Sequence, residues 1–230
     1  MSQWVRGARA VFFDAVGTLL FPAPAAPDVY AGAARRRGVE CGPADILARF
    51  ATAFRAEEAA DRAAGWVTSE EREVARWRRI VAETLPGVPD PDGCFRELYD
   101  HFADPANWAV SPDAAAVFAA LQSRGIAVGL GSNYDARLCR VLDGHPGLDA
   151  LRERVVVSAT VGHRKPAAAF FDEVTRLAGC DRGAIVFVGD DVGNDYAGAT
   201  AAGMRAVLLD PGGRFPEVER RIERLTELNP

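Results

Sequence analysis

The sequence lacks the cysteine pattern of a disulfide framework or a zinc site. Its 230 residues include only four cysteines, and no two of them have CxxC spacing. Scattered cysteines of this kind are typical of free thiols in a reducing compartment. The three histidines, His101, His145 and His163, also lack the mutual spacing of metal ligands. These absences argue against a zinc centre and against a disulfide-stabilised fold.

A membrane-spanning run and an excess of positive charge are absent as well. No apolar stretch is long enough to cross a bilayer, and Asp14 interrupts the N-terminal stretch that could pass for a signal peptide. The formal net charge is -5, which argues against nucleic acid as the main partner. We therefore expect a cytoplasmic protein, a monomer or homodimer, that contacts neither membrane nor nucleic acid.

Five short apolar or β-branched runs predict the strands of one sheet. They cover residues 10–13, 126–130, 155–158, 184–188 and 205–209. Apolar runs without alternation are typical of strands that are covered on both faces. Helical patterns occur near residues 113–124, 135–142, 170–177, 195–202 and 215–225. Strands that alternate with helices favour an α/β fold with a parallel sheet and right-handed crossovers.

The first strand is separated from the others by a region with helical patterns only. A proline-rich connection follows residue 21, and apolar residues then recur at helical spacing to about residue 107. Ser69 with Glu70 and Glu71 marks a helix start. We expect a bundle of roughly four helices here. The predicted core therefore comprises residues 1–21 and 110–230, and residues 22–109 form an all-helical insertion.

Polar side chains follow four of the predicted strands. In chain order they are Asp14; Ser132 and Asn133; Lys165; and Asp190, Asp191 and Asp195. Parallel strands deliver their carboxyl ends to one edge of the sheet, so these groups can converge there. Each group alone could be a turn or a helix cap. We favour convergence, because the alternative needs four separate coincidences.

The converging groups suit phosphoryl chemistry. Asp14 and Asp190 would repel each other unless a cation lay between them, and their oxygen ligands suit Mg2+. Lys165 would steady the nucleophile and the transferring phosphoryl group. The Ser132 hydroxyl and the free N–H groups at the next helix start would bind anionic oxygens. A carboxylate nucleophile would split hydrolysis into two steps through a covalent intermediate.

These residues resemble, in order, the four motifs of the haloacid dehalogenase-like (HAD) hydrolase superfamily. The motifs are Asp14-Ala15-Val16-Gly17-Thr18-Leu19, Ser132-Asn133, Lys165-Pro166, and Gly189-Asp190 with Asp195. The resemblance implies a Rossmann-like core with strand order 5-4-1-2-3. It also implies that the helical insertion is a cap of the C1 type. Most members are phosphatases, so a small phosphorylated molecule is the implied substrate.

The resemblance also implies a role for each matched residue. Asp14 would be the nucleophile and Lys165 its catalytic partner. Mg2+ would be bound by Asp14, Asp190 and the backbone carbonyl of Val16. The other matched positions are the substrate-binding residues Thr18, Ser132 and Asn133 and the metal-supporting residues Asp191, Asn194 and Asp195.

Residue 16 departs from the phosphatase pattern. Phosphatases of the superfamily usually have a second Asp there, which protonates the leaving oxygen and later activates water. Val16 can do neither. General acid-base help is typically worth about 3 to 5 kcal/mol of barrier. The substitution should impair proton transfer more than Mg2+ binding, because Val16 keeps the main-chain carbonyl.

Three interpretations stay open. The first is a Mg2+-dependent phosphatase that prefers good leaving groups, such as acyl or aryl phosphates, or borrows a proton donor from the helical insertion. The second is a metal-independent 2-haloacid dehalogenase, which also lacks the second Asp but does not need an acidic fourth motif. The third is a non-catalytic protein that binds a phosphorylated ligand or a partner protein. The donor candidates, which we expect on solvated helix faces, are Glu57, Glu58, Asp61, His101 and Asp104.

Overall fold

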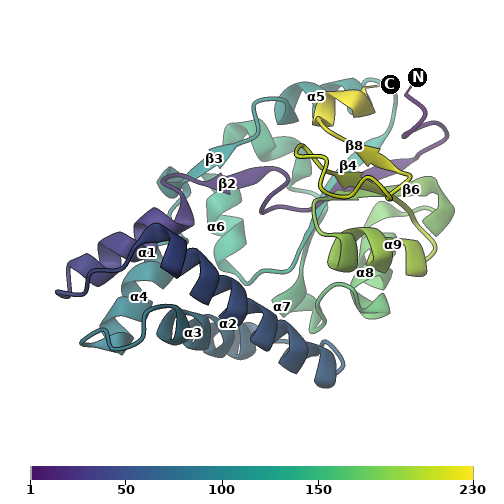
Figure 1. Cartoon of the computed structure of the whole chain (residues 1–230). Coiled ribbons are helices and arrows are strands. Elements are labelled where there is room, and N and C mark those ends of the chain that lie inside the picture. Colours follow the sequence, from purple (N-terminus) through teal and green to yellow (C-terminus); the bar gives the residue numbers. More distant parts are fainter. Residues whose placement is uncertain (1, 230) are drawn as a thin grey trace.

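The computed structural model describes residues 2–229 and contains a six-stranded parallel sheet (Figure 1). Its strands are β1 (Ala10–Phe13), β4 (Ala127–Ser132), β5 (Val155–Val157), β6 (Ile185–Gly189), β7 (Arg205–Leu209) and β8 (Arg221–Ile222). They lie in the order β5-β4-β1-β6-β7-β8. The five expected strands follow the predicted order, and β8 adds a sixth strand beside β7. The predicted α/β class is confirmed.

The central strands β1 and β6 are buried along their whole length, which explains their unbroken apolar sequences. Alternate side chains enter two cores, one on each face. Phe13 packs on one face with α5 (Ala114–Gln122) and α6 (Arg137–Asp143). Phe12 packs on the other face with α8 (Ala168–Ala178) and α9 (Gly198–Ala201). The sheet is therefore held between two helical layers, and its carboxyl-end edge is left for polar side chains.

Two predicted helices in the last third of the chain need correction. The helix expected near residues 215–225 is absent from the described chain, which instead forms β8 and a 3-10 turn at Leu225–Leu228. Here Leu208 N–H donates to Arg220 O and Asp210 N–H donates to Ile222 O, both at 2.8 Å. Pairing with the free edge of β7 overrides the local helical pattern. The helix expected at 195–202 begins earlier, as a π-helical turn at Val192–Ala197 that α9 continues.

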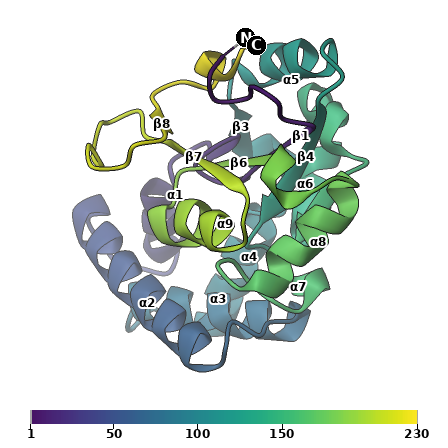
Figure 2. The ribbon, with the colours of Figure 1, turned by 90° about the vertical axis from the view of Figure 1, so that its right-hand side faces the viewer.

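Four α-helices within residues 26–101 lie on one side of the sheet, and we call them the helical module (Figures 1 and 2). They are α1 (Ala26–Arg35), α2 (Pro43–Ala63), α3 (Glu70–Thr84) and α4 (Pro91–His101). The Ser69 hydroxyl accepts the N–H of Arg72 at 3.2 Å, which confirms the predicted start of α3. Across residues 2–229, no helix combines the length and apolar character of a membrane span.

An unpredicted antiparallel pair of strands lies where the chain enters and leaves the helical module. It joins β2 (Leu20–Pro22) to β3 (Trp108–Val110). Ser111 N–H also donates to Leu19 O at 2.8 Å, which continues the pairing toward the main sheet. The two connections therefore run side by side and fix the module close to the end of β1.

Candidate active site

Asp14 and Lys165 meet at the carboxyl-end edge of the sheet. Asp14 follows β1 directly, and its N–H donates to Val188 O of the neighbouring β6 at 2.8 Å. Lys165 lies between α7 (Ser158–Val161) and α8. Its ammonium group donates to Asp14 Oδ1 and Asp195 Oδ1, both at 2.6 Å, and to Gly131 O at 2.9 Å. All three ammonium hydrogens are thereby engaged, so the lysine holds Asp14 in a fixed orientation.

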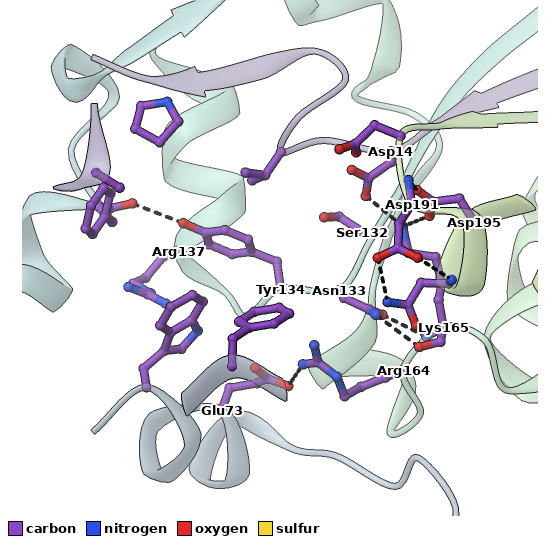
Figure 3. A pocket seen from close by; sticks show the side chains of 18 of the residues that line it. Asp14, Glu73, Ser132, Asn133, Tyr134, Arg137, Arg164, Lys165, Asp191 and Asp195 are labelled. Carbon is purple, nitrogen blue, oxygen red and sulfur yellow. Dashed lines mark hydrogen bonds and ion pairs between the residues drawn. The ribbon is translucent and has the colours of Figure 1, made fainter. Parts of the chain in front are cut away.

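The carboxylates of Asp14 and Asp195 contact this lysine (Figure 3), and that of Asp190 lies beside them. Asp14, Asp190 and Asp195 each place an oxygen within 4.8 Å of the other two. Burial raises the pKa of Asp190 to about 6, and the Asp195 carboxylate adds to the effect. Burial also raises the pKa of Asp195 to about 7 and that of Asp14, although Lys165 opposes both shifts. One ammonium group does not balance three clustered carboxylates.

This carboxylate cluster fits a divalent cation. Its ligands are hard oxygens, the donor type that Mg2+ prefers, and its excess negative charge is what such an ion would offset. Burial lowers the pKa of Lys165, but Asp14 and Asp195 outweigh burial and raise it above its ordinary value. The lysine therefore stays charged, and the remaining negative charge would be offset by an added cation or by protonation of a carboxylate.

Two glycines make room for the cluster. A Cβ atom on Gly17, whose φ is +96°, would lie 2.6 Å from Asp190 Oδ2. A Cβ atom on Gly189 would lie 2.1 Å from Asp195 Oδ2. Neither position can accept a side chain without displacing a carboxylate, since interiors are close-packed. This explains why glycine accompanies the acidic residue in both the first and the fourth motif.

The predicted substrate-binding residues have different surroundings. Ser132 ends β4 and lines the cavity with Asp14. The Thr18 hydroxyl donates to Asp190 Oδ1 at 3.4 Å. Asn133 holds the backbone of Lys165, because its Nδ2 donates to Lys165 O at 3.0 Å and its Oδ1 accepts Lys165 N–H at 2.7 Å. Contact of these three residues with a substrate stays a prediction.

The predicted metal-supporting residues divide into two groups. Asp195 belongs to the carboxylate cluster itself. Asp191 and Asn194 lie on the rim, where Asp191 Oδ1 accepts the N–H groups of Gly193 and Asn194 at 2.7 and 2.8 Å. Asn194 Nδ2 also donates to Glu58 Oε1 of α2 at 3.0 Å. The rim therefore touches the helical module, and a metal-supporting role for Asp191 and Asn194 stays a prediction.

A cavity of about 370 Å³ extends from the carboxylate cluster to the helical module (Figure 3). Val16 lines it beside Asp14. The opposite side is formed by an aromatic wall, which consists of Tyr30, Phe50, Phe54, Trp77, Phe102, Trp108 and Tyr134. These residues come from α1, α2, α3, β3 and two loops, so no local sequence pattern could have grouped them.

The proton donors proposed from the sequence are placed elsewhere. Among the described residues, none of the five candidates lines the cavity. The expectation of solvated faces is wrong for Glu57 and Asp61, which are 7% and 1% exposed. Glu57 accepts from Arg72 at 2.8 Å and from Arg79 at 3.0 Å, and Asp61 forms an ion pair with Arg76. Helical spacing could not show that arginines of the neighbouring helix cover this face.

Arg164 is a site residue that sequence reasoning missed. It precedes Lys165, is 4% exposed and forms an ion pair with Glu73 of α3. Its Nε also lies 3.5 Å from Asp61 Oδ2 of α2. We call this group the module ion cluster, which comprises Glu57, Asp61, Glu73, Arg72, Arg76, Arg79 and Arg164. It ties the loop that carries Lys165 to the helical module.

A hydrolase site of this kind agrees with what the chain resembles. Residues 8–203 match the model of the haloacid dehalogenase-like hydrolase family, and the chain belongs to this family of enzymes. It is 31% identical over 209 residues to human "Haloacid dehalogenase-like hydrolase domain-containing protein 3", covering 87% of this chain and 81% of the relative. It is 31% identical over 227 residues to ribulose-1,5-bisphosphate 5-phosphatase of Halopiger xanaduensis, covering 96% and 92%.

A solved dehalogenase shares the fold. It superposes with a TM-score of 0.73 at 19% identity, and the match covers 96% of this chain and 95% of that one. Identity at this level speaks for the architecture alone, since one fold hosts several reactions. The choice between phosphatase and dehalogenase therefore depends on the site.

Proposed function

We propose that the chain is a Mg2+-dependent phosphatase that acts on a small phosphorylated molecule. The observation that carries the proposal is the carboxylate cluster, in which Asp14 and Asp195 are buried and pair with Lys165 while half-buried Asp190 lies beside them. A phosphate monoester adds more negative charge to this site, so it can bind there only with a cation. The phosphatase relative from Halopiger supports the same reaction class.

In this proposal Asp14 and Asp190 and the Val16 carbonyl hold Mg2+, with Asp191, Asn194 and Asp195 as support. Bound Mg2+ would supply neutralisation of the charge on the phosphoryl oxygens. Asp14 attacks phosphorus, and the bond between phosphorus and the leaving oxygen breaks with its electron pair on that oxygen. Water then attacks the phosphorus of the aspartyl-phosphate, which releases inorganic phosphate and restores Asp14.

The surrounding residues orient these steps. Lys165 holds Asp14 through the 2.6 Å contact and opposes the rise in the pKa of Asp14 that burial causes. Asn133 in turn fixes the backbone of Lys165. Ser132 lines the cavity beside Asp14 and is placed to donate to a phosphoryl oxygen. Removal of Asn133 should therefore weaken catalysis by misplacing Lys165.

We also propose that residues 22–109 form a cap over a core made of residues 1–21 and 110–230. The aromatic wall supports this division, because most of its residues come from the helical module while the carboxylate cluster comes from the sheet. The contacts of Glu58 with Asn194 and of Glu73 with Arg164 join the two parts around the cavity. A cap in this position would exclude water and select the leaving group.

A 2-haloacid dehalogenase is the second candidate function. Val16 and the aromatic wall favour it, since a halide leaves without a proton and the substrate is partly apolar. The three clustered carboxylates disfavour it, because a metal-independent reaction gives no reason to keep Asp190 and Asp195 close together beside Asp14. Chloride release from 2-chloropropionate in the presence of EDTA would support the dehalogenase and contradict the phosphatase.

The deciding experiment is phosphate release from a panel of phosphomonoesters with Mg2+ or with EDTA. We expect turnover with Mg2+, loss of turnover with EDTA and loss in the Asp14→Asn variant. Equal turnover in wild type and Asp14→Asn would refute the nucleophile. Binding of phosphate without any turnover would instead favour the non-catalytic interpretation.

A further inference from the structure

The aromatic wall is continuous. Neighbouring ring centroids are 5.9 Å apart for Phe54 and Phe50, 5.8 Å for Phe50 and Tyr30, 6.3 Å for Tyr30 and Phe102, 5.9 Å for Phe102 and Trp108, and 6.4 Å for Trp108 and Tyr134. These separations are within the usual range for aromatic pairs. Figure 3 shows Tyr134 and Arg137 across the cavity from Asp14 and Lys165. The cavity therefore has a charged end and an aromatic end.

Several polar groups on this wall are already used inside the protein. The Trp108 indole N–H and the Tyr134 hydroxyl both donate to Phe102 O at 3.2 Å. Arg137 donates to Asp135 through Nε at 2.8 Å and through Nη2 at 2.7 Å. A sugar placed on this wall would lose hydrogen bonds with water that these groups cannot replace. Each unreplaced bond costs on the order of 1–3 kcal/mol.

The absence of an acid at residue 16 also restricts the leaving group, and this restriction is independent of the aromatic wall. Val16 lines the cavity beside Asp14 and cannot donate a proton. A phenol, with a pKa of about 10 as in tyrosine, leaves readily as its anion. An alcohol with a pKa of about 16, near that of water, does not. The lack of a proton donor for the leaving oxygen and the aromatic wall of the cavity thus both favour an aromatic leaving group.

We infer that the substrates are aryl phosphate monoesters, with the phosphate at the carboxylate cluster and the aromatic ring on the aromatic wall. This inference rests on the proposed phosphatase function and names its substrate class. In the first step Asp14 Oδ forms a bond to phosphorus while the bond between phosphorus and the aryl oxygen breaks. The aryloxide leaves with the electron pair and takes its proton from solvent water. The cavity, at about 370 Å³, is at the small end of the usual range for ligand pockets.

The first test separates leaving-group acidity from fit to the wall. The measurement is kcat/KM with Mg2+ for 1-naphthyl phosphate, cyclohexylmethyl phosphate, glycerol 3-phosphate and glucose 6-phosphate. We expect 1-naphthyl phosphate to exceed glycerol 3-phosphate by about a hundredfold or more, the size of a missing general acid. Cyclohexylmethyl phosphate should also exceed glycerol 3-phosphate, since both leave as alcohols but only the former is apolar. Faster turnover of glucose 6-phosphate would overturn the inference and leave the phosphatase intact. No turnover of any ester would overturn both.

The second test changes the wall and not the charged end. Phe54→Leu removes one ring of the wall, and Phe21→Leu makes the same change at a residue that is 41% exposed and outside the cavity lining. We expect Phe54→Leu to raise KM for 1-naphthyl phosphate about three- to tenfold, the usual size of an aromatic contact. Inhibition by inorganic phosphate should stay unchanged. If Phe54→Leu and Phe21→Leu give the same KM for 1-naphthyl phosphate, the aromatic ring of the substrate does not lie on the aromatic wall.

Discussion

The carboxylate cluster and the module ion cluster both contain buried acids, but they differ in charge balance. In the carboxylate cluster three acids share one lysine, and burial raises the pKa of all three. In the module ion cluster three acids face four arginines. Burial raises the pKa of Glu57, yet Arg79 and Arg72 outweigh burial and lower it. The sequence contains similar numbers of acids in both places, so the partners make the difference.

The difference in charge balance distinguishes a cluster that can bind a ligand from a cluster that has a structural role. Buried charges that are paired with opposite charges need no ligand, and they link the helices and loops that carry them. Buried charge of one sign keeps a free-energy cost that protonation or a ligand of opposite sign can remove. We therefore place the proposed reaction centre at the carboxylate cluster, whereas the module ion cluster fixes α2 and α3 against the loop that carries Lys165. The same substitution should have opposite effects in the two clusters.

The largest expected effect is loss of catalysis in Asp14→Asn without loss of stability. Turnover should fall at least about a thousandfold, as when a nucleophile is removed. Stability should hold or rise, because one of three crowded carboxylates loses its charge while Lys165 keeps Asp195 and Gly131 O as partners. Steady-state kinetics and urea unfolding check the two halves. A variant that unfolds much more readily than the wild type would contradict the charge-excess argument.

Asp61→Asn should give the reverse pattern, with a large loss of stability. Asp61 is 1% exposed and pairs with Arg76, which is equally buried. The change leaves the Arg76 charge without its closest partner, and breaking a buried pair costs roughly 3 kcal/mol or more. The matched control is Asp92→Asn, whose exposed pair with Arg78 is worth about 1 kcal/mol or less. Urea unfolding of both variants measures the difference, and equal losses would show that burial of the cluster is unimportant.

Sequence reasoning succeeded where local pattern decides the structure. The unbroken apolar runs around Phe12 and Phe187 predicted central strands, and polar residues at strand ends converged because the sheet is parallel. It failed for β8, where two residues pair with a distant edge. It also failed for Asp61, whose helical position looks solvated until Arg164, far along the chain, is placed beside it. Long-range partners were the missing information in both cases.

Val16→Asp should have a smaller effect, which is a gain in turnover. The change adds an acid to the carboxylate cluster, where negative charge is already in excess. We expect turnover of glycerol 3-phosphate to rise about tenfold or more, which is part of the usual worth of a general acid. Mg2+ affinity should be retained, since the main chain is unchanged. Val16→Asn is the matched control, because it has similar size and no acid. Equal alkyl phosphate rates in Val16→Asp and wild type would count against the missing-acid argument.

The smallest expected effect is a pH dependence of stabilisation by Mg2+. The pKa of Asp190 is about 6 in the folded protein and about 4 in an unfolded chain. Asp190 therefore binds more protons in the folded state between pH 4 and 6, and its contribution to the stability of the metal-free protein rises as pH falls through this window. Bound Mg2+ must compete with those protons, so the rise in Tm on adding Mg2+ should be larger at pH 7.5 than at pH 5.

Thermal unfolding with and without Mg2+ at the two pH values measures this effect. The Asp92→Asn variant is the control, because this carboxylate is exposed and lies outside the cavity lining. It should keep the pH dependence, whereas Asp190→Asn should lose it together with Mg2+ stabilisation. If all three proteins show the same pH dependence, its origin lies outside the carboxylate cluster. The excess negative charge around Lys165 would then not be the charge that Mg2+ offsets.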